Sequence, residues 1–478
     1  MNTEVLIVGA GPTGMTLANE LQLAGVPAVV VDKLPKRSEL SKAGGVQSRT
    51  LEALDQRGLL EPLLATGDYP ISAGHFAGIP LSLEHARHRL PWRSVPQVAM
   101  ERFLEQHLAA HGVHVRRGLD LTGLSQDDDG VTATFADGTV LRSRYLVAAD
   151  GGHSTVRTLL GAAFPGRAGT VTMVAADVRL RGADAPVMHT SSKDGHWAQI
   201  FLLGTDPEGR PLRRLVLGGP GSLPRDVPVT EDEIRDGLRA VFGTRLELLE
   251  LRYARRITNA ARQAAQYRHG RVFLAGDAAH VHLPLGAQGM NTGMQDAINL
   301  GWKLAAVVRG QTPESLLDSY HAERHPVGEI VLRNVQAQSL LLDREGTRDP
   351  DVLATRELFT ALLQQQDVQR YVGDLLSGMA VRYPIPGAGT HPLIGLPAPD
   401  PKLGSTRLHE LLRSARGVLL DPAGEFGELA ERWSDRVDRI GQCPGTEPML
   451  VRPDGYVCWA GEPADLAAAL RRWFGEPH

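Results

Sequence analysis

Three glycines near the start of the chain have the spacing with which proteins bind the phosphates of a dinucleotide. Gly9, Gly11 and Gly14 form the pattern G-x-G-x-x-G directly after an apolar run at residues 4–8. Gly9 permits a tight turn, Gly11 lets backbone N–H groups approach a pyrophosphate, and Gly14 lets a helix pack closely on a strand. The N-terminus of that helix also favours the negative charge of the phosphates. The pattern alone does not distinguish FAD from NAD.

An aspartate completes this motif at the end of the next apolar run. Asp32 stands 18 residues after Gly14, close to the separation of about 20 residues at which an acid meets the ribose hydroxyls of an adenine dinucleotide. A strand, a glycine loop, a helix, a second strand and an acid therefore follow one another within the first 32 residues. This complete context makes the glycine pattern far more specific than it would be by itself.

Two later segments place another aspartate at the end of a predicted strand. Residues 144–157 read RYLVAADGGHSTVR, and residues 271–304 read RVFLAGDAAHVHLPLGAQGMNTGMQDAINLGWKL. Asp150 follows a buried strand and leads through two glycines into a helix. Asp277 ends a strand that is followed by a loop rich in Pro and Gly, and helical periodicity predicts a helix over residues 291–304. By itself, an Asp at a strand end is more often a turn former or a helix cap than a ligand.

Taken together, these segments resemble the flavoprotein monooxygenases of the para-hydroxybenzoate hydroxylase class, and specifically the subgroup that hydroxylates aromatic polyketides such as angucyclines, anthracyclines and tetracyclines. The resemblance rests on GAGPTG, DGGHSTVR, AGDAAHVHLPLGAQGMNTGMQDAINLGWKL and SYHAERHPVG, and it continues into RGVLLD and VRPDGYVCWAG near the C-terminus. The sequence also resembles the rifamycin monooxygenases, which serve a different purpose. The resemblance implies FAD as the cofactor, NAD(P)H and O2 as co-substrates, and a bulky aromatic compound as the substrate.

The resemblance also implies which residues hold FAD. In this family the acid at the position of Asp277 contacts the ribityl chain, and the glycine-rich loop over residues 284–291 lets backbone lie against the isoalloxazine edge. A helix that begins near Asn291 would point its N–H groups at the flavin N1/O2 region, where the charge of the reduced flavin collects. The predicted cofactor-binding residues are Gly9, Gly11, Thr13, Gly14, Asp32, Lys33, Lys42, Gln97, Leu121, Asp150, Thr155, Asp277, Pro284, Gly289, Met290 and Asn291.

Some positions depart from the family pattern. Lys42 stands where relatives usually have Arg, which preserves the charge but loses the bidentate fork. For Lys33 and Lys42, ordinary solvated charge is the alternative interpretation. Gly44 falls in a segment where the rifamycin subgroup carries an additional Arg, and this difference weakens the rifamycin interpretation.

No catalytic side chain is assigned from the sequence, because the family's flavin carries the oxygen chemistry through a C4a-hydroperoxide. His280 and His282 could chelate a metal, but no third or fourth ligand accompanies them at suitable spacing, so we expect no metal. His153 and Arg157 are ambiguous. For Arg157 the alternatives are a contact to NAD(P)H and a structural ion pair.

The expected fold class is α/β, with a Rossmann-like FAD-binding domain, an inserted antiparallel-sheet substrate domain and a C-terminal thioredoxin-like domain. The inserted domain is expected to roof a pocket over the flavin, with Trp197 and Phe201 as candidates for its lining and core packing as their alternative role. The C-terminal part lacks CxxC, so we expect it to stabilise structure or oligomers. The predicted boundaries are residues 1–161 and 269–382 for the FAD-binding domain with its helical region, residues 162–268 for the substrate-binding sheet domain, residues 383–404 for a linker and residues 405–478 for the thioredoxin-like domain.

Composition excludes several classes of protein. Hydrophobic residues make up 42% and charged residues 22% of the chain, which is typical of a globular protein. The net charge of -4 offers no basic excess for a nucleic-acid partner. No apolar run reaches membrane-spanning length and no signal peptide is recognisable, so we expect a cytoplasmic protein with no membrane partner, as a monomer or homodimer.

Three other functions remain open on the sequence. A Baeyer–Villiger oxygenase could use the same fold, because the flavin rather than a side chain carries the difference. Antibiotic inactivation of the rifamycin type would use the same machinery. A flavoprotein that sequesters an aromatic ligand without turnover is a non-enzymatic alternative. The tryptophan-rich WxWxIP signature of flavin-dependent halogenases is absent from the sequence.

Overall fold

The first strand of the chain lies at the centre of a mainly parallel sheet. The computed structural model describes residues 2–478 apart from residues 40, 68, 72, 87–88, 185–186, 192–194, 206–207, 222, 343–348, 444 and 462. The largest sheet has the order β19-β20-β11-β1-β2-β8, and its four pairings from β20 to β8 are parallel. Its strands are β1 (Asn2–Val8), β2 (Ala28–Asp32), β8 (Val115–Arg117), β9 (Leu121–Gln126), β10 (Val131–Phe135), β11 (Val140–Ala148), β19 (Arg268–His269) and β20 (Val272–Leu274).

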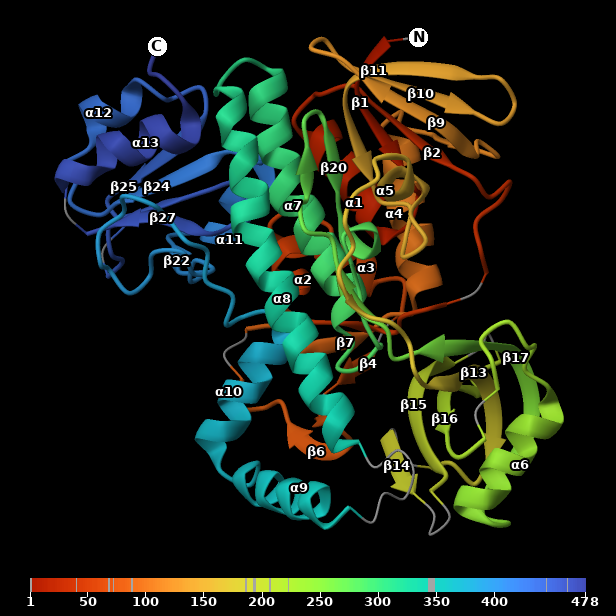
Figure 1. Ribbon diagram of the computed structural model, residues 1–478. Helices are drawn as coiled ribbons and strands as arrows, with labels where there is room; N and C mark the ends of the chain where they lie inside the picture. The colour runs from red at the N-terminus through yellow and green to blue at the C-terminus, as the bar shows by residue number, and fades with distance from the viewer. Residues whose placement is uncertain are drawn as a thin grey trace.

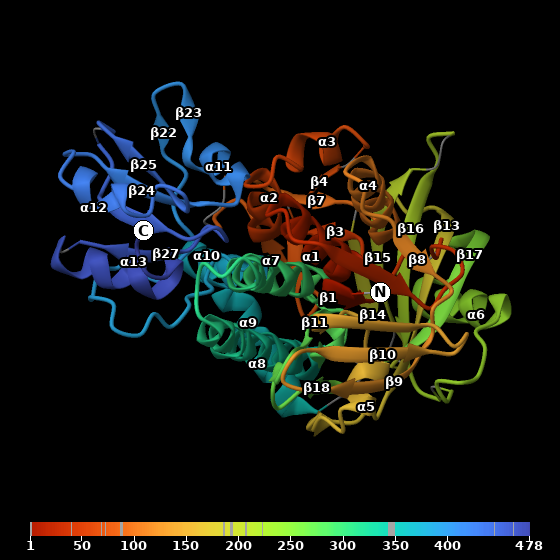
Figure 2. The same ribbon diagram turned by 90° about the horizontal axis from the view of Figure 1, so that it is seen from above.

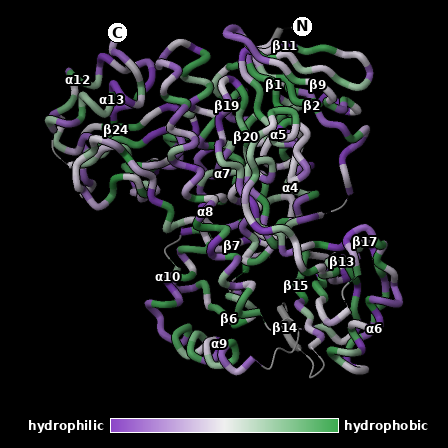
Figure 3. Tube along the Cα trace, viewed as in Figure 1, coloured by the Kyte–Doolittle hydropathy of each residue, from purple (hydrophilic) through white to green (hydrophobic). Residues whose placement is uncertain are grey.

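Apolar runs explain why these strands are central. The side chains of Val5, Leu6 and Ile7 in β1 are fully buried, as expected for a strand covered on both faces. The hydropathy trace shows hydrophobic residues gathered around β1 (Figure 3). Because β1, β2 and β11 are parallel, their carboxyl ends lie at the same edge of the sheet, where ligands of open α/β sheets bind.

Helices α1 (Pro12–Leu23) and α7 (Gln288–Val308) pack against each other beside this sheet (Figures 1 and 2). Glycines on α7 make the close approach possible. A Cβ at Gly293 would lie 2.4 Å from Thr13 Oγ1, and a Cβ at Gly301 would lie 2.4 Å from the Cβ of Glu20. Helices α1 and α7 are thus packed closely together because these two positions of α7 carry no side chain.

A second body contains a five-stranded antiparallel sheet with the order β14-β15-β16-β13-β17 (Figure 1, lower right). Helix α6 (Glu231–Phe242) packs on it around the buried side chains of Ile234 and Leu238. An antiparallel sheet is thus present in the part of the chain for which the sequence predicts one. The strands are β13 (Thr172–Arg181), β14 (Val187–Ser191), β15 (Trp197–Thr205), β16 (Pro211–Gly218) and β17 (Glu247–Thr258).

The remaining helices and several short strands connect these two sheets and form the helical part of the molecule. None of the helices in the described ranges combines the length and apolar character needed to cross a membrane. The connecting elements are α2 (Ser48–Asp55), α3 (Leu60–Leu64), α4 (Gln97–Ala110), α5 (Thr155–Leu159), α8 (Asp318–Leu341), α9 (Pro350–Leu362), α10 (Gln366–Ser377), β3 (Gly45–Val46), β4 (Tyr69–Ile71), β5 (Ala73–Phe76), β6 (Ile79–Ser82), β7 (Trp92–Ser94), β12 (Gly166–Arg167), β18 (Ala261–Gln263) and β21 (His280–Val281).

The C-terminal part is a four-stranded sheet with the order β25-β24-β26-β27. β24 and β25 are parallel, whereas β26 is antiparallel to both of its neighbours. The proline-rich segment before it packs on this sheet, since Gly395 N–H donates to the carbonyl of Val457 at 2.8 Å. The elements are β22 (Lys402–Leu403), β23 (Thr406–Arg407), α11 (Leu408–Leu411), β24 (Gly417–Asp421), α12 (Gly427–Glu431), β25 (Val437–Gly441), β26 (Met449–Val451), β27 (Val457–Ala460) and α13 (Leu466–Phe474).

Buried ion pairs join this C-terminal sheet to α7 and α8. Arg452, directly after β26, donates to Glu323 Oε1 at 2.6 Å and Oε2 at 2.9 Å, and Lys303 donates to the same Oε2 at 2.8 Å. All three side chains are almost completely buried. Burial lowers the pKa of Lys303 to about 8, whereas Arg452 and Lys303 outweigh the effect of burial and lower the pKa of Glu323 to about 2.

Candidate active site

A cavity of about 1490 Å³ lies between the parallel sheet, the beginning of α7 and the five-stranded sheet. Pockets for one drug-sized ligand usually measure roughly 300–1,000 Å³, so this cavity can hold more than one ligand. Its lining combines residues from all three sequence motifs. All of the predicted cofactor-binding residues line it except Gly14 and Asn291.

The three glycines of the first motif have different roles. Gly9 has φ of 109°, and a Cβ there would lie 2.2 Å from the carbonyl oxygen of Ala149. A Cβ on Gly14 would lie 2.0 Å from the carbonyl oxygen of Gly9, so Gly14 allows the helix to pack and does not face the cavity. No atom lies within 4 Å of the Cβ position of Gly11. Gly11 therefore leaves open space at the N-terminus of α1, where a phosphate would bind.

Asp32 stands at the end of β2 and is fixed by backbone donors. Its Oδ2 accepts a hydrogen bond from Ala10 N–H at 2.9 Å, and its Oδ1 accepts one from Leu34 N–H at 2.8 Å. Each carboxylate oxygen has further acceptor capacity. The carboxylate is thus held beside the glycine loop with lone pairs available to the hydroxyls of a ribose.

Asp150 lines the cavity and carries an unsatisfied buried atom. Its Oδ2 accepts a hydrogen bond from Val156 N–H at 3.1 Å, but its Oδ1 is buried without a partner among the described residues. Burial raises the pKa of Asp150 above its ordinary value. A buried polar atom without a partner is costly, and a ligand with hydroxyl or N–H donors would satisfy it.

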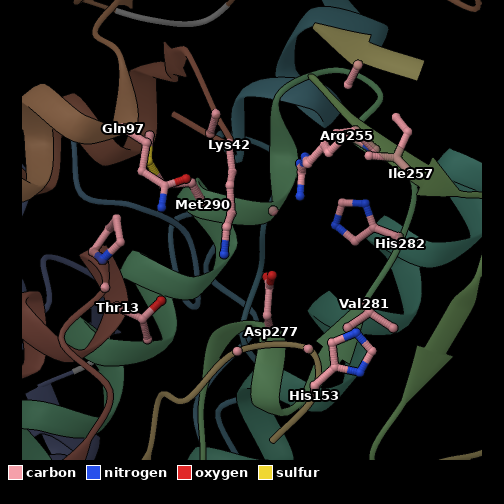
Figure 4. Close-up of a pocket in the computed structure, with 18 of the residues that line it drawn as sticks. Thr13, Lys42, Gln97, His153, Arg255, Ile257, Asp277, Val281, His282 and Met290 are labelled. Carbon is pink, nitrogen blue, oxygen red and sulfur yellow. The ribbon is translucent and has the colours of Figure 1, made fainter. Parts of the chain in front are cut away.

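Asp277 projects into the cavity between Thr13 and His282 (Figure 4). It follows Gly276, whose φ of 60° makes the turn and whose Cβ position lies 2.6 Å from Thr13 Oγ1. The backbone N–H of Gly276 donates to Asp296 Oδ2 on α7 at 3.0 Å. The orientation of the Asp277 turn is therefore set by a buried carboxylate on the neighbouring helix.

Asp296 belongs to a network that the sequence did not reveal. Arg324 Nε donates to Asp296 Oδ1 at 2.6 Å, and His280 Nε2 lies 2.8 Å from Asp296 Oδ2. Arg324 comes from the segment SYHAERHPVG, together with Glu323, which pairs with Arg452. This segment contributes to the site indirectly, by supplying buried charges that position α7 and the Asp277 turn.

The glycine-rich loop leads into α7 one turn earlier than predicted. The helix begins at Gln288, after Ala287 in the left-handed conformation, rather than at Asn291. Asn291 is fully buried behind the loop. Its Nδ2 donates to the carbonyls of Gly45 at 3.0 Å and Ala287 at 2.7 Å. The structure therefore places Asn291 where it shapes the loop, while Pro284, Gly289 and Met290 line the cavity.

Two of the predicted polar residues, Lys42 and Gln97, also line the cavity. The side chains of Lys42 and Gln97 lie near Met290, and the Lys42 ammonium points into the cavity (Figure 4). Gln97 Nε2 donates to Glu101 Oε1 at 2.7 Å. The remaining predicted residues Lys33, Leu121 and Thr155 also line the cavity.

Comparison with protein families agrees with this geometry. Residues 2–335 match the model of the FAD binding domain family, and residues 391–477 match the aromatic-ring hydroxylase C-terminal family. This chain belongs to the FAD-dependent aromatic-ring hydroxylases. It is therefore an FAD-dependent monooxygenase with the mixed α/β fold predicted from the sequence.

Relatives match the hydroxylase along its whole length. It is 42% identical to a rifampicin monooxygenase of Streptomyces venezuelae over 99% of this chain and 98% of the relative. It is 41% identical to a 12-dehydrotetracycline 5-monooxygenase/anhydrotetracycline 6-monooxygenase of Streptomyces rimosus, with both chains covered completely. The solved structure of an anhydrotetracycline hydroxylase from Streptomyces rimosus superimposes with a TM-score of 0.88 at 41% identity, again over both whole chains.

The two histidines of the His-x-His pair in this hydroxylase diverge. His280 is buried against Asp296, whereas His282 lines the cavity. His282 Nδ1 lies 2.8 Å from the carbonyl oxygen of Leu283, and its Nε2 is buried without a hydrogen-bond partner in the described part of the chain. A Cβ on Gly289 would lie 3.6 Å from His282 Nε2 and 4.0 Å from Asp277 Oδ1. His282 thus has a buried, unpartnered ring nitrogen close to the glycine-rich loop.

Arg157 has a structural role in the hydroxylase that differs from a simple ion pair. Its guanidinium donates to the carbonyls of Ala278 and Gly152, both at 2.8 Å, and lies 3.8 Å from the ring centroid of Phe164. These contacts tie the second motif to the third. Two of its N–H groups are thus used within the protein, and part of the side chain also lines the cavity.

The two aromatic residues predicted as candidates for the cavity lining, Phe201 and Trp197, lie in different places. Phe201 lines the cavity, as the sequence interpretation allowed. Trp197 does not, because it is buried against Gly218, where a Cβ would lie 2.4 Å from the indole ring. Core packing is therefore the role of Trp197.

One group of acids outside the cavity has the composition of a metal site. Asp55, Asp400 and His409 place their ligand atoms close together. Arg89 and Arg407 form ion pairs with Asp55, and both also pair with Asp400. These guanidinium groups account for the acidic charge without a metal ion.

Proposed function

We propose that this chain hydroxylates a polycyclic aromatic compound of the polyketide type, with NAD(P)H as the reductant and O2 as the source of oxygen. The observation that carries this proposal is one large cavity, bordered by the three predicted flavin motifs and by the antiparallel sheet of residues 162–268. The names of relatives with full-length coverage, rifampicin monooxygenase and anhydrotetracycline monooxygenase, support the substrate class.

The residues around the cavity fit FAD. Gly11 and Thr13 would hold the pyrophosphate at the N-terminus of α1, and Asp32 would accept from the ribose of the adenosine. Asp277 would accept from the ribityl hydroxyls, and the unpartnered Oδ1 of Asp150 has room for a donor from the same cofactor. Bound FAD would supply the reaction with NAD(P)H and the activation of O2.

The loop over residues 284–290 and the beginning of α7 would then lie along the isoalloxazine edge. The N-terminus of a helix carries a partial positive charge. Negative charge on the reduced cofactor would be stabilised there without reorganisation of the protein. This role requires backbone N–H groups rather than a charged side chain, so it depends on the one-turn-earlier start of α7 at Gln288.

The five-stranded sheet would supply an apolar wall for the aromatic substrate. Ala175, Phe201, Val216 and Ile257 come from four of its strands and line the same cavity. These apolar side chains, together with the ring of Phe201, favour an aromatic ligand. They also exclude water, which is needed to couple O2 activation to substrate oxidation rather than to release of peroxide.

His282 is the proton acceptor in this proposal. Because the carbonyl of Leu283 can only accept, the neutral ring carries its proton on Nδ1 and leaves a lone pair on Nε2, a buried atom without a partner among the described residues. Burial lowers the pKa of His282 below its ordinary value, which keeps the ring neutral at physiological pH. Nε2 would accept the proton of a substrate hydroxyl as the ring of the substrate is oxidised.

The proposal is tested with purified holoenzyme, NADPH and air-saturated buffer. A panel containing anhydrotetracycline, rifampicin and smaller polycyclic phenols is screened for stimulated NADPH oxidation, released peroxide and product mass. We expect at least one member to stimulate oxidation with little peroxide and to gain one oxygen as a ring hydroxyl. A ring-expanded ester would favour Baeyer–Villiger oxygenation. Peroxide alone, or tight binding without any stimulated oxidation, would contradict the hydroxylase proposal.

A further inference from the structure

Arg255 is a charged residue on the apolar wall of the cavity. It belongs to β17, and its side chain points into the cavity on the side of His282 (Figure 4). Asp277, one of the proposed flavin-binding residues, projects into the same cavity (Figure 4). Arg255 therefore reaches the part of the cavity where a substrate would meet the flavin.

The guanidinium of Arg255 has no hydrogen bond or ion pair with any residue that the structure describes, in contrast to its neighbours. Arg256, the next residue, donates to Glu233 through two nitrogens at 2.7 Å each and to the carbonyl of Val227 at 2.8 Å. Arg214, on a nearby strand, pairs with Asp177 and donates to the carbonyls of Ser41 and Lys42. Both neighbours are held by the fold, whereas the donors of Arg255 remain available.

A partly buried guanidinium without a partner is unfavourable for folding. Burial removes water from the charge, and only a carboxylate or similar acceptor compensates for that loss. The same burial lowers the pKa of Arg255, but an arginine remains charged at physiological pH. A ligand with an anionic oxygen would provide the missing acceptor, and the planar fork of Arg255 suits such an oxygen well.

We propose that Arg255 binds an anionic oxygen of the aromatic substrate, either a carboxylate or an ionised phenol or enol, and so makes this hydroxylase selective for acidic aromatic compounds. This inference rests on the proposed function. The substrate would lay its apolar rings on Phe201 and Ile257 and direct one acidic oxygen to Arg255. Arg255 would position the substrate and take no part in the oxygen transfer itself.

The test compares anthraquinone-2-carboxylate with anthraquinone-2-carboxamide, which share the rings and differ in the charge. Each is titrated into oxidised holoenzyme while the flavin absorbance is followed, so that binding is measured without turnover. The enzyme forms are wild type, Arg255→Gln, Arg255→Lys and Arg252→Gln. Arg252 is the matched control, because it lies on the same strand, is exposed and does not line the cavity.

We expect wild type to bind the acid about tenfold or more tightly than the amide, as for hydrogen bonds to charged groups. The ratio should fall to near one in Arg255→Gln, be partly kept in Arg255→Lys and be unchanged in Arg252→Gln. An unchanged ratio in Arg255→Gln, or an equal loss in Arg252→Gln, would overturn the inference. So would a higher KM for NADPH in Arg255→Gln with an intact acid preference, since Arg255 would then hold the coenzyme phosphate.

Failure of the proposed function gives a different result. If Arg255→Gln loses the acid preference but no panel member ever gains oxygen, the anionic subsite stands and the hydroxylase proposal falls. If neither anthraquinone perturbs the flavin of any enzyme form, the anionic subsite is contradicted, whereas the hydroxylase proposal is decided by the panel.

Discussion

Asp296 on α7 accepts a hydrogen bond from the backbone N–H of Gly276 at 3.0 Å, and this contact orients the turn that carries Asp277. The same carboxylate receives Arg324 at 2.6 Å in a fully buried environment. One buried acid thus links the helix that would face the flavin to the residue that would hold its ribityl chain.

Asp296→Asn should destabilise the protein strongly. The amide oxygen can still accept from Gly276, but Arg324 becomes a buried charge without its counter-charge, which costs roughly 3–5 kcal/mol in comparable cases. Thermal unfolding of the variant should occur at a clearly lower temperature, and FAD should dissociate more readily. Asp127→Asn is the control, because Asp127 pairs with Arg142 at the surface and its loss should change stability little. Equal unfolding temperatures for the two variants would contradict this account.

The same pair makes a contribution to acid stability. Burial acts to raise the pKa of Asp296, but Arg324 and His280 outweigh it and hold the pKa below the ordinary value of 3.8. The stabilisation is therefore present above that ordinary value and is lost as the pH falls through the lowered pKa. Denaturant unfolding measured from pH 7 to pH 3 should lose stability at the acid end in wild type, and this loss should be smaller in Asp296→Asn.

Substitutions of Gly11 and Gly14, two glycines of the same motif, should have different effects on cofactor binding and on folding. Gly11 has φ of -79° and no atom near its Cβ position, so Gly11→Ala should keep the unfolding temperature of the FAD-free protein and weaken FAD binding by about tenfold or more. Gly14→Ala should instead destabilise the protein itself, because its Cβ would lie 2.0 Å from the carbonyl oxygen of Gly9. Fluorescence titration with FAD and thermal unfolding measure the two effects. Unchanged FAD affinity in Gly11→Ala would contradict the pyrophosphate site.

His282→Leu should slow phenol hydroxylation by roughly tenfold to a hundredfold, within the lower part of the range for general bases, while the FAD content stays the same. Because the pKa of His282 is lowered by burial, neutral Nε2 should persist below pH 6.5, the ordinary value. The kcat/KM of wild type should then stay level from pH 8 to pH 6.5 and decrease only at lower pH. A decrease centred at or above pH 6.5 would exclude His282 as the proton acceptor.

Much of the framework could be predicted because its signals are local. The strand before Gly9, the acid at Asp32 and the alternating strands around Phe201 are encoded within short windows by apolar runs, glycines and period-two patterns. The start of α7 was predicted three residues late, because Ala287 adopts the left-handed conformation without the glycine that would signal it. The phosphate-binding candidates likewise come from a local glycine pattern, whereas the ribityl role of Asp277 comes from the family resemblance.

Long-range pairings could not be predicted in the same way. Asp296 resembles an ordinary helix residue until Arg324 and Gly276 are seen around it. Arg255 and Arg256 are adjacent and chemically identical in the sequence, and only the position of Glu233 shows that one is paired and the other is available. The assignment of Trp197 to the core similarly depended on its contact with Gly218.

The central claim is that one cavity brings FAD and an aromatic compound together for oxygen transfer. The most direct test is turnover under ¹⁸O2 with the panel member that most strongly stimulates NADPH oxidation, followed by mass spectrometry of the product. The account predicts one ¹⁸O atom on the aromatic ring, in an amount close to the NADPH consumed. A product without the label, or labelled peroxide with unchanged substrate for every compound that binds, would contradict it.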